Sequence, residues 1–222
     1  MAPRFLIAAG FALCARAALA APNEIKVFTD ELAGYGQHAL EAHVNKGRTP
    51  LQVMPEYSYG IRRYWELSLQ LPMAFSGEAS RTEGYRTEMQ YIAPHDAYQG
   101  LYWGFNLELA RIARIGEPRF SNVEIIPIVG LRAARWHLVA NPGFDRALSG
   151  KQRATSFQPA AKVAYRGLGR NDYGFEYYEE SRVLYAAWDG KLGKSDINLG
   201  IGRGLANATD RWVLKLIYEF AF

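Results

Sequence analysis

Apolar and polar residues alternate with a period of two through much of this chain, and this pattern limits the fold more than any other feature. In residues 65–71 every odd position holds Trp or Leu, and every even position holds Glu, Ser or Gln. The same alternation returns at 85–91, 101–109 and 197–202. A strand turns successive side chains to opposite faces, whereas a helix with about 3.6 residues per turn would scatter this set around its circumference. The pattern therefore predicts an all-β chain.

We predict twelve strands, at 36–45, 55–62, 64–72, 83–93, 100–110, 120–131, 135–141, 156–166, 172–178, 182–189, 195–203 and 212–222. Residues 120–131 and 179–190 are ambiguous. The first contains a continuous apolar run and also Pro127, which cannot donate a ladder hydrogen bond. Ten strands is therefore the alternative. No linker divides residues 21–222, which we predict to form one domain.

The connections between these strands alternate in length. Long ones fall at 46–54, 73–82, 111–119 and 142–155, and short ones at Arg63, 132–134 and 167–171. Bacterial outer-membrane barrels show this asymmetry, with short periplasmic turns and longer outer loops. An even number of strands would place both termini in the periplasm.

The N-terminus has the layout of a secretory signal peptide. Arg4 supplies the charge, residues 5–15 an apolar run, and Ala18, Leu19 and Ala20 a small-residue cleavage site. We expect residues 1–20 to be removed near Ala20. The single cysteine, Cys14, lies in this segment, so the mature chain has no disulfide. No stretch approaches the roughly 20 apolar residues that a transmembrane helix needs, which argues against a helical membrane protein.

The last strand carries apolar residues at every second position and ends on an aromatic residue, as Leu214, Leu216, Tyr218, Phe220 and Phe222. This ending resembles the C-terminal β-signal of Gram-negative outer-membrane barrels. The resemblance implies recognition by the barrel-assembly machinery and insertion into the bacterial outer membrane. Tyr218, Phe220 and Phe222 would form the assembly signal.

A looser similarity covers more of the chain. The strand from Trp65 to Pro72, the run 125–130 leading to Trp136, and the pair Asn141 and Pro142 resemble small barrels of the phenol-degradation MetA-pathway type, which are grouped as transporters. This resemblance implies transport of a small solute.

Together these features predict a closed antiparallel up-and-down transmembrane β-barrel. Closure follows from the bilayer, because an open sheet edge would leave backbone groups without partners in lipid. Large aromatic residues lie near predicted strand ends, and the face opposite the apolar one is charged. A secreted soluble barrel of the lipocalin type, or a sandwich, is the alternative fold.

If the apolar faces meet lipid, the lumen receives charges of both signs. The candidates are Glu66, Arg86, Glu88, Glu108, Lys162, Arg166 and Glu176. The first hypothesis is a channel or transporter for a small solute, in which the charges of a narrow polar lumen set selectivity. The alternative is a non-conducting structural or surface-interaction barrel, sealed by salt bridges across the lumen, whose loops contact lipopolysaccharide. Twelve strands enclose more room than the eight that side chains can just fill.

Other functions find little support. The four histidines form no motif with a serine and show no metal-ligand spacing, so we predict no enzyme activity, no cofactor and no metal site. Without Arg4 and Arg16 the chain has 24 basic and 22 acidic residues, and this nearly even balance argues against nucleic-acid binding. The predicted outer loops carry more cations than acids, and we expect them to contact the phosphates of lipopolysaccharide.

Overall fold

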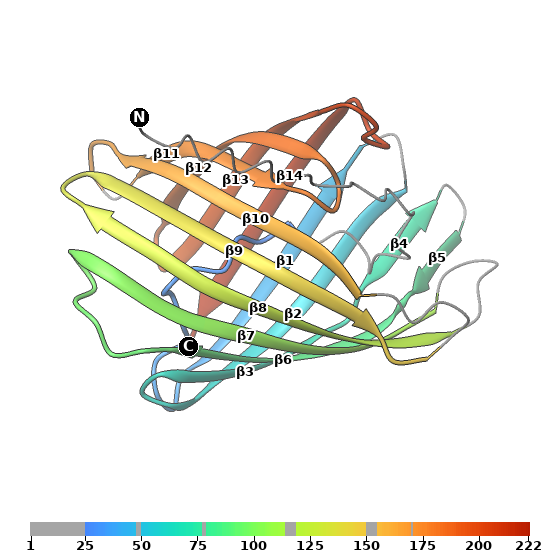
Figure 1. The fold of residues 1–222 in the computed structure, drawn as a ribbon, viewed down its shortest axis with the longest axis horizontal. Helices are drawn as coiled ribbons and strands as arrows, with labels where there is room; N and C mark the ends of the chain where they lie inside the picture. Colours follow the sequence, from blue (N-terminus) through green and yellow to red (C-terminus); the bar gives the residue numbers. More distant parts are fainter. Residues whose placement is uncertain (1–24, 48–49, 77–78, 114–118, 150–154, 170) are drawn as a thin grey trace, which may run out of the picture.

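The computed structural model describes residues 25–47, 50–76, 79–113, 119–149, 155–169 and 171–222 (Figure 1). Its elements there are all strands: β1 (His38–Lys46), β2 (Leu51–Arg62), β3 (Trp65–Gln70), β4 (Met73–Ser76), β5 (Ala79–Thr82), β6 (Gly84–Ile92), β7 (Gly100–Ile112), β8 (Phe120–Ala133), β9 (Trp136–Ala147), β10 (Thr155–Arg166), β11 (Asp172–Tyr178), β12 (Val183–Leu192), β13 (Ser195–Gly204) and β14 (Trp212–Ala221). Among these residues no helix is long and apolar enough to cross a membrane. The expected signal peptide, residues 1–20, lies outside the described residues.

Twelve strands close into a barrel. β1, β2, β3 and β6 to β14 each pair antiparallel with the next in chain order, and β14 pairs with β1. The predicted all-β, up-and-down barrel of twelve strands is confirmed, and the ten-strand alternative is wrong. At the seam, Leu40 faces Phe220 and Ala42 faces Tyr218. His38 and Phe222 exchange backbone hydrogen bonds of 3.0 and 2.9 Å, and their rings stack. The predicted assembly-signal residues therefore lie along the closing seam.

Prolines inside the strands explain why parts of β8 and β9 were hard to predict. Pro127 lies within β8, and the β8–β9 register sets it opposite Pro142, where the ladder is interrupted. Pro142 in turn faces Pro159 of β10. Because the β8–β9 ladder is interrupted where Pro127 and Pro142 meet, no N–H donor is needed between these strands at that point. β9 continues to Ala147, through residues predicted to be a loop.

The predicted connection 73–82 is not a simple loop. It contains the hairpin β4–β5, and β4 pairs with Leu51, Gln52 and Val53 at the start of β2. In Figure 1 this hairpin extends beyond the ring of strands. The prediction missed it because Ser and Gly residues interrupt the period-two pattern there.

The two faces of the wall are reversed relative to a soluble protein. Trp103 is 56% exposed and Phe175 is 60% exposed on the outside, whereas Glu56 and Glu108 inside are 2% and 1% exposed. We call the rim that carries His38 and Phe222 the termini end, and the opposite rim the far end. Aromatic pairs gather on the outside near the termini end: Trp65 with Tyr91, at a ring separation of 4.6 Å, and Trp136 with Tyr165, at 5.0 Å.

Candidate functional site in the barrel interior

The N-terminal segment occupies the barrel interior. Residues 25–33, which we call the plug, lie between the expected cleavage site and β1 and form no strand. Ile25 and Phe28 are each only 2% exposed. In Figure 1 the plug belongs to the dark-blue trace that crosses between the strands. It runs from Ile25, near the far-end residue Tyr178, to Asp30, near the termini-end residue Arg132.

Polar side chains of the wall hold the plug through its backbone. Tyr178 Oη and Lys215 Nζ donate to the Ile25 carbonyl at 2.6 and 3.1 Å. Asn141 Nδ2 donates to the Phe28 carbonyl at 3.0 Å. Seven wall residues, each on a different strand, make side-chain hydrogen bonds to the plug: Glu41, Glu66, Gln90, Arg132, Asn141, Tyr178 and Lys215. Much of the circumference therefore contacts the plug.

Apolar packing adds to these bonds. Val27 and Phe28 belong to one buried cluster with wall residues that point inward: Ile92, Tyr102, Ile126, Ile128, Val139, Tyr178, Val183, Tyr185 and Val213. A water-filled lumen would leave these wall side chains in water, at a cost of about 25 cal/mol per Å² of apolar surface. The plug gives this apolar patch a partner.

A close backbone crossing positions the plug where it joins the wall. Residues 34–37 turn the chain into β1, with Gly36 at a φ of 75°. The Gly36 amide donates to the Gly60 carbonyl at 2.8 Å, and the Gly60 amide donates to the Gln37 carbonyl at 3.0 Å. A Cβ atom on Gly60 would lie 2.1 Å from the Gly34 carbonyl oxygen. Glycine at position 60 therefore lets the chain cross β2.

One end of the plug is fixed by an ion pair. Arg132 Nε donates to Asp30 Oδ2 at 3.1 Å, and His95 Nε2 lies 2.9 Å from the same oxygen. Asp30 lies outside the strands. Burial alone would raise the pKa of Asp30, but the hydrogen bond and charge of Arg132, with the hydrogen bond to His95, hold that pKa below its usual value. Asp30 is therefore ionised at neutral pH.

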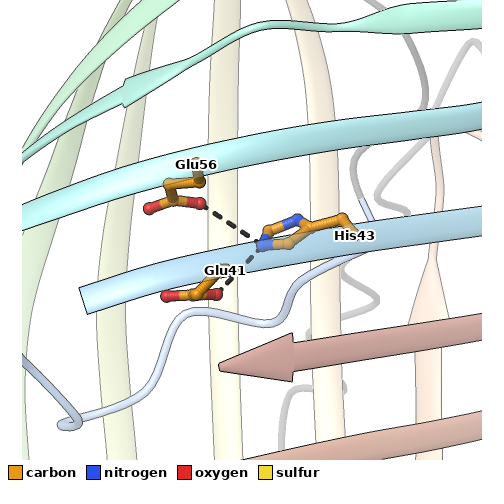
Figure 2. A group of neighbouring side chains, drawn as sticks. All are labelled: Glu41, His43 and Glu56. Atoms are coloured by element: carbon orange, nitrogen blue, oxygen red, sulfur yellow. Dashed lines mark hydrogen bonds and ion pairs between the residues drawn. The ribbon is translucent and has the colours of Figure 1, made fainter. Parts of the chain in front are cut away.

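Three ligand-type side chains meet on β1 and β2 (Figure 2). Glu41 faces Glu56 across the β1–β2 pair, and His43 lies two residues further on the same face of β1. His43 Nε2 lies 3.0 Å from Glu41 Oε2 and 3.3 Å from Glu56 Oε2. Lys26 of the plug donates to both Glu41 oxygens at 2.9 and 3.0 Å. We call Glu41, His43 and Glu56 the triad.

Hydrogen bonds continue from the triad along β2, β3 and β6. Gln70 Nε2 donates to Glu56 at 3.0 Å and to Glu88 at 2.7 Å. Ser58 donates to Glu56 at 3.1 Å. Further along the same part of the wall, Arg86 Nη1 donates to Glu108 at 3.2 Å. Gln70 therefore donates to two buried carboxylates, and Arg86 pairs directly with Glu108, so that these buried charges have hydrogen-bond partners.

A second network lies on β10, β11, β12 and β14. Glu176 accepts a hydrogen bond from Lys215, and its Oε2 lies 2.8 Å from Tyr178 Oη. Lys162 Nζ lies 3.4 Å from Glu176 and 2.9 Å from Asp189. The Glu176 and Lys215 side chains are 2% and 1% exposed. Because Lys215 also donates to Ile25, this network connects the wall to the plug.

Six of the predicted lumen residues point into this interior: Glu66, Arg86, Glu88, Glu108, Lys162 and Glu176. Glu66 accepts the Ala33 amide of the plug, and the other five belong to the networks described above. Arg166 lies at the end of β10 instead. Its side chain is 47% exposed and pairs with Asp172 at 3.1 Å.

Neither the plug nor the triad was predicted from the sequence. Residues 21–35 lie outside the twelve predicted strands. Ile25, Val27 and Phe28 were the available signal, as apolar residues between a cleavage site and a strand. The triad carried the signal Glu41-Ala42-His43, which places two ligand-type side chains on one face of a strand.

Two small cavities border the plug. One is lined in part by Lys26, Phe28 and Glu124. The other is lined in part by Ile25, His43 and Gln52.

No protein-family model matches this chain, and no curated protein matches its sequence. The closed barrel is consistent with the resemblance to outer-membrane barrels. The finer resemblance to the MetA-pathway type finds no match to support it.

Proposed function

We propose that this chain is a bacterial outer-membrane barrel that its own N-terminal segment closes, and that it acts as a non-conducting structural or surface-interaction protein. The observation that carries the proposal is the plug, which lies inside the barrel and is hydrogen-bonded to residues of seven wall strands. Of the two hypotheses drawn from the sequence, this filled interior favours the sealed barrel. We assign the protein no catalytic role.

The outer surface supports a membrane location. Soluble monomers rarely expose large contiguous apolar surfaces, and here Leu101, Trp103 and Phe175 are each more than half exposed on the wall. A transmembrane strand needs about 9–11 residues, and β7 and β8 have 13 and 14. Aromatic pairs near the termini end correspond to the interfacial girdle of such barrels. Export would follow signal cleavage near Ala20 and insertion by the barrel-assembly machinery.

The far end would face outward and contact lipopolysaccharide. Exposed cations at this end include Arg111, Arg119, Arg146 and Arg211. Guanidinium groups bind phosphate through paired hydrogen bonds, and lipopolysaccharide presents phosphates at that surface. These arginines support a surface-interaction role for the barrel.

Cysteine labelling in intact cells tests location and orientation together. Thr209→Cys would place a thiol at the far end, and Lys194→Cys is the matched control in the β12–β13 turn at the termini end. A membrane-impermeant maleimide should label Thr209→Cys in intact cells and Lys194→Cys only after the outer membrane is permeabilised. Recovery of the protein in the soluble fraction, or equal labelling of both variants in intact cells, would overturn the proposal.

A channel opened by displacement of the plug is the second candidate. The plug leads into β1 through residues 34–37 and is held by hydrogen bonds, ion pairs and packing. Its departure would leave a twelve-strand lumen, which is wider than side chains alone can fill. A small solute would then have a passage lined by the charges of the two networks.

A further inference from the structure

We propose that the triad of Glu41, His43 and Glu56 is a binding site for a divalent transition-metal ion such as Zn²⁺, and that Lys26 covers this site when the plug is in place. Metal and plug would then compete for the same two carboxylates. The site itself depends only on the barrel wall, whereas the competition rests on the proposed closure by the plug.

The donor atoms are already close enough to share one ion. One donor atom from each triad residue lies within 4.8 Å of the others. The separations of 3.0 and 3.3 Å from His43 Nε2 to the two carboxylates are near about 3.3 Å, the edge of a tetrahedron with bonds of about 2.0 Å. One imidazole and two carboxylates are a donor set that suits zinc, with a fourth position left for water.

The wall holds these donors in place. Glu56 accepts hydrogen bonds from Ser58 and Gln70, which orient its carboxylate. The β1–β2 register sets Glu41 opposite Glu56, and all three side chains are no more than 6% exposed. Supporting hydrogen bonds of this kind orient metal ligands and raise affinity.

The imidazole has a further feature that fits a ligand. Its Nδ1 is buried and has no hydrogen-bond partner among the described residues. His43 also lines the small cavity next to the plug. A metal bound at Nε2 requires the ring proton on Nδ1, and the other ring N–H of a metal-bound histidine donates to a carboxylate, a carbonyl or water.

Lys26 supplies the positive charge at the triad while the plug is in place. Its Nζ lies 2.9 Å from Glu41 Oε1 and 4.0 Å from Glu56 Oε1. It also lies 3.0 Å from Glu41 Oε2, the oxygen that faces His43. An ammonium group and a divalent ion cannot both occupy this small volume without strong repulsion. Metal binding therefore requires the Lys26 ammonium group to withdraw from the carboxylates, which removes this contact between the plug and the wall.

Cobalt titration of the detergent-solubilised protein, freed of metal by a chelator, tests the site. Tetrahedral Co²⁺ gives visible absorption bands, and Zn²⁺ should displace it. We expect Lys26→Met to bind Co²⁺ at least about tenfold more tightly than the unaltered protein. Lys194→Met is the control, because it removes an exposed lysine from the β12–β13 turn, away from the triad and from the networks that hold the plug, and should leave the affinity unchanged.

Loss of a ligand decides whether the triad holds the ion. In the Lys26→Met background, His43→Ala should abolish the cobalt spectrum. Glu41→Gln, which keeps the side-chain shape, serves if His43→Ala does not fold. A spectrum that survives these changes, or that never appears with Lys26→Met, would overturn the metal site.

Plug accessibility tests the competition separately. Thr29→Cys puts a thiol on the buried part of the plug. Zn²⁺ should raise its rate of maleimide labelling, and should not do so when His43→Ala is added. Cobalt binding without any change in labelling would leave the site standing and overturn the competition. Rapid labelling of Thr29→Cys without metal would instead contradict the proposed closure.

Discussion

Replacing Glu176 with glutamine tests whether water reaches the barrel interior. The Glu176 carboxylate lies between two ammonium groups, Lys215 and Lys162, and Lys162 also has Asp189 at 2.9 Å. Glutamine keeps the shape and removes the charge. Lys215 then has only neutral acceptors among its described partners: Ile25 O, Tyr178 Oη and the amide oxygen of the new glutamine. Removing one partner of a buried ion pair costs about 3–5 kcal/mol, which is a large share of the about 5–15 kcal/mol that holds a domain folded.

A double variant and an exposed pair provide the comparison. Glu176→Gln with Lys215→Met removes the stranded ammonium group as well, so most of the lost stability should return. Asp172→Asn breaks the pair with Arg166, whose side chain is 47% exposed, and should cost at most about 1 kcal/mol.

Urea unfolding in lipid vesicles, followed by tryptophan fluorescence, measures these free energies. The reasoning requires a coupling energy of about 2–4 kcal/mol between Glu176 and Lys215. A cost for Glu176→Gln as small as that of Asp172→Asn would refute it, because water would then be solvating Lys215 in an open lumen.

Three further predictions concern the plug and the seam. Asp30→Asn should produce channel openings at pH 7 in planar bilayers, because Arg132 loses the charge that anchors the plug. The pKa of Asp30 is lower in the folded protein than in the unfolded chain, so the stability that the ionised Asp30 adds is present above about pH 4 and is lost as the pH falls further. The unaltered barrel should therefore stay silent from about pH 7 to 5 and open only below about pH 4. Gly60→Ala would set a Cβ atom 2.1 Å from the Gly34 carbonyl oxygen and should lower the unfolding free energy by about 1–3 kcal/mol in urea titrations. Phe222→Ala removes the ring that stacks on His38 and should reduce the fraction of chain that runs as a folded, heat-modifiable band, whereas an unchanged fraction would deny this residue a part in assembly.

The wall of the barrel could be predicted because its strands repeat the same local pattern, the alternation of apolar and polar residues. At residues 65–71 and 101–109 the alternation distinguishes a lipid-type face from a polar face without reference to any other part of the chain. A register slip of one residue would turn Leu67 inward and Glu66 outward, so the same pattern also limits how strands pair. The even strand number then brings the last strand back to the first.

The interior could not be predicted in the same way, because it exists only after closure. Residues 25–33 carry both apolar and charged side chains, and only the closed wall creates a place that accepts both. The meeting of Glu41 with Glu56 depends on the β1–β2 register, which the connection between the strands determines. The sequence therefore predicted a charged lumen and left open what fills it. Arg166 shows that position parity alone does not place a side chain in the lumen. It has the same inward parity as Lys162 but lies at the rim of the barrel.

The central claim is that the plug closes the barrel, and single-channel recording tests it most directly. The unaltered protein and a variant lacking residues 25–33 would be inserted in planar bilayers, with folding of both checked by circular dichroism. We predict that the unaltered barrel is silent and that the shortened one conducts steadily, with an ion preference that Glu176→Gln alters. Steady conductance of the unaltered barrel, or silence of a folded and inserted barrel without the plug, would contradict the account.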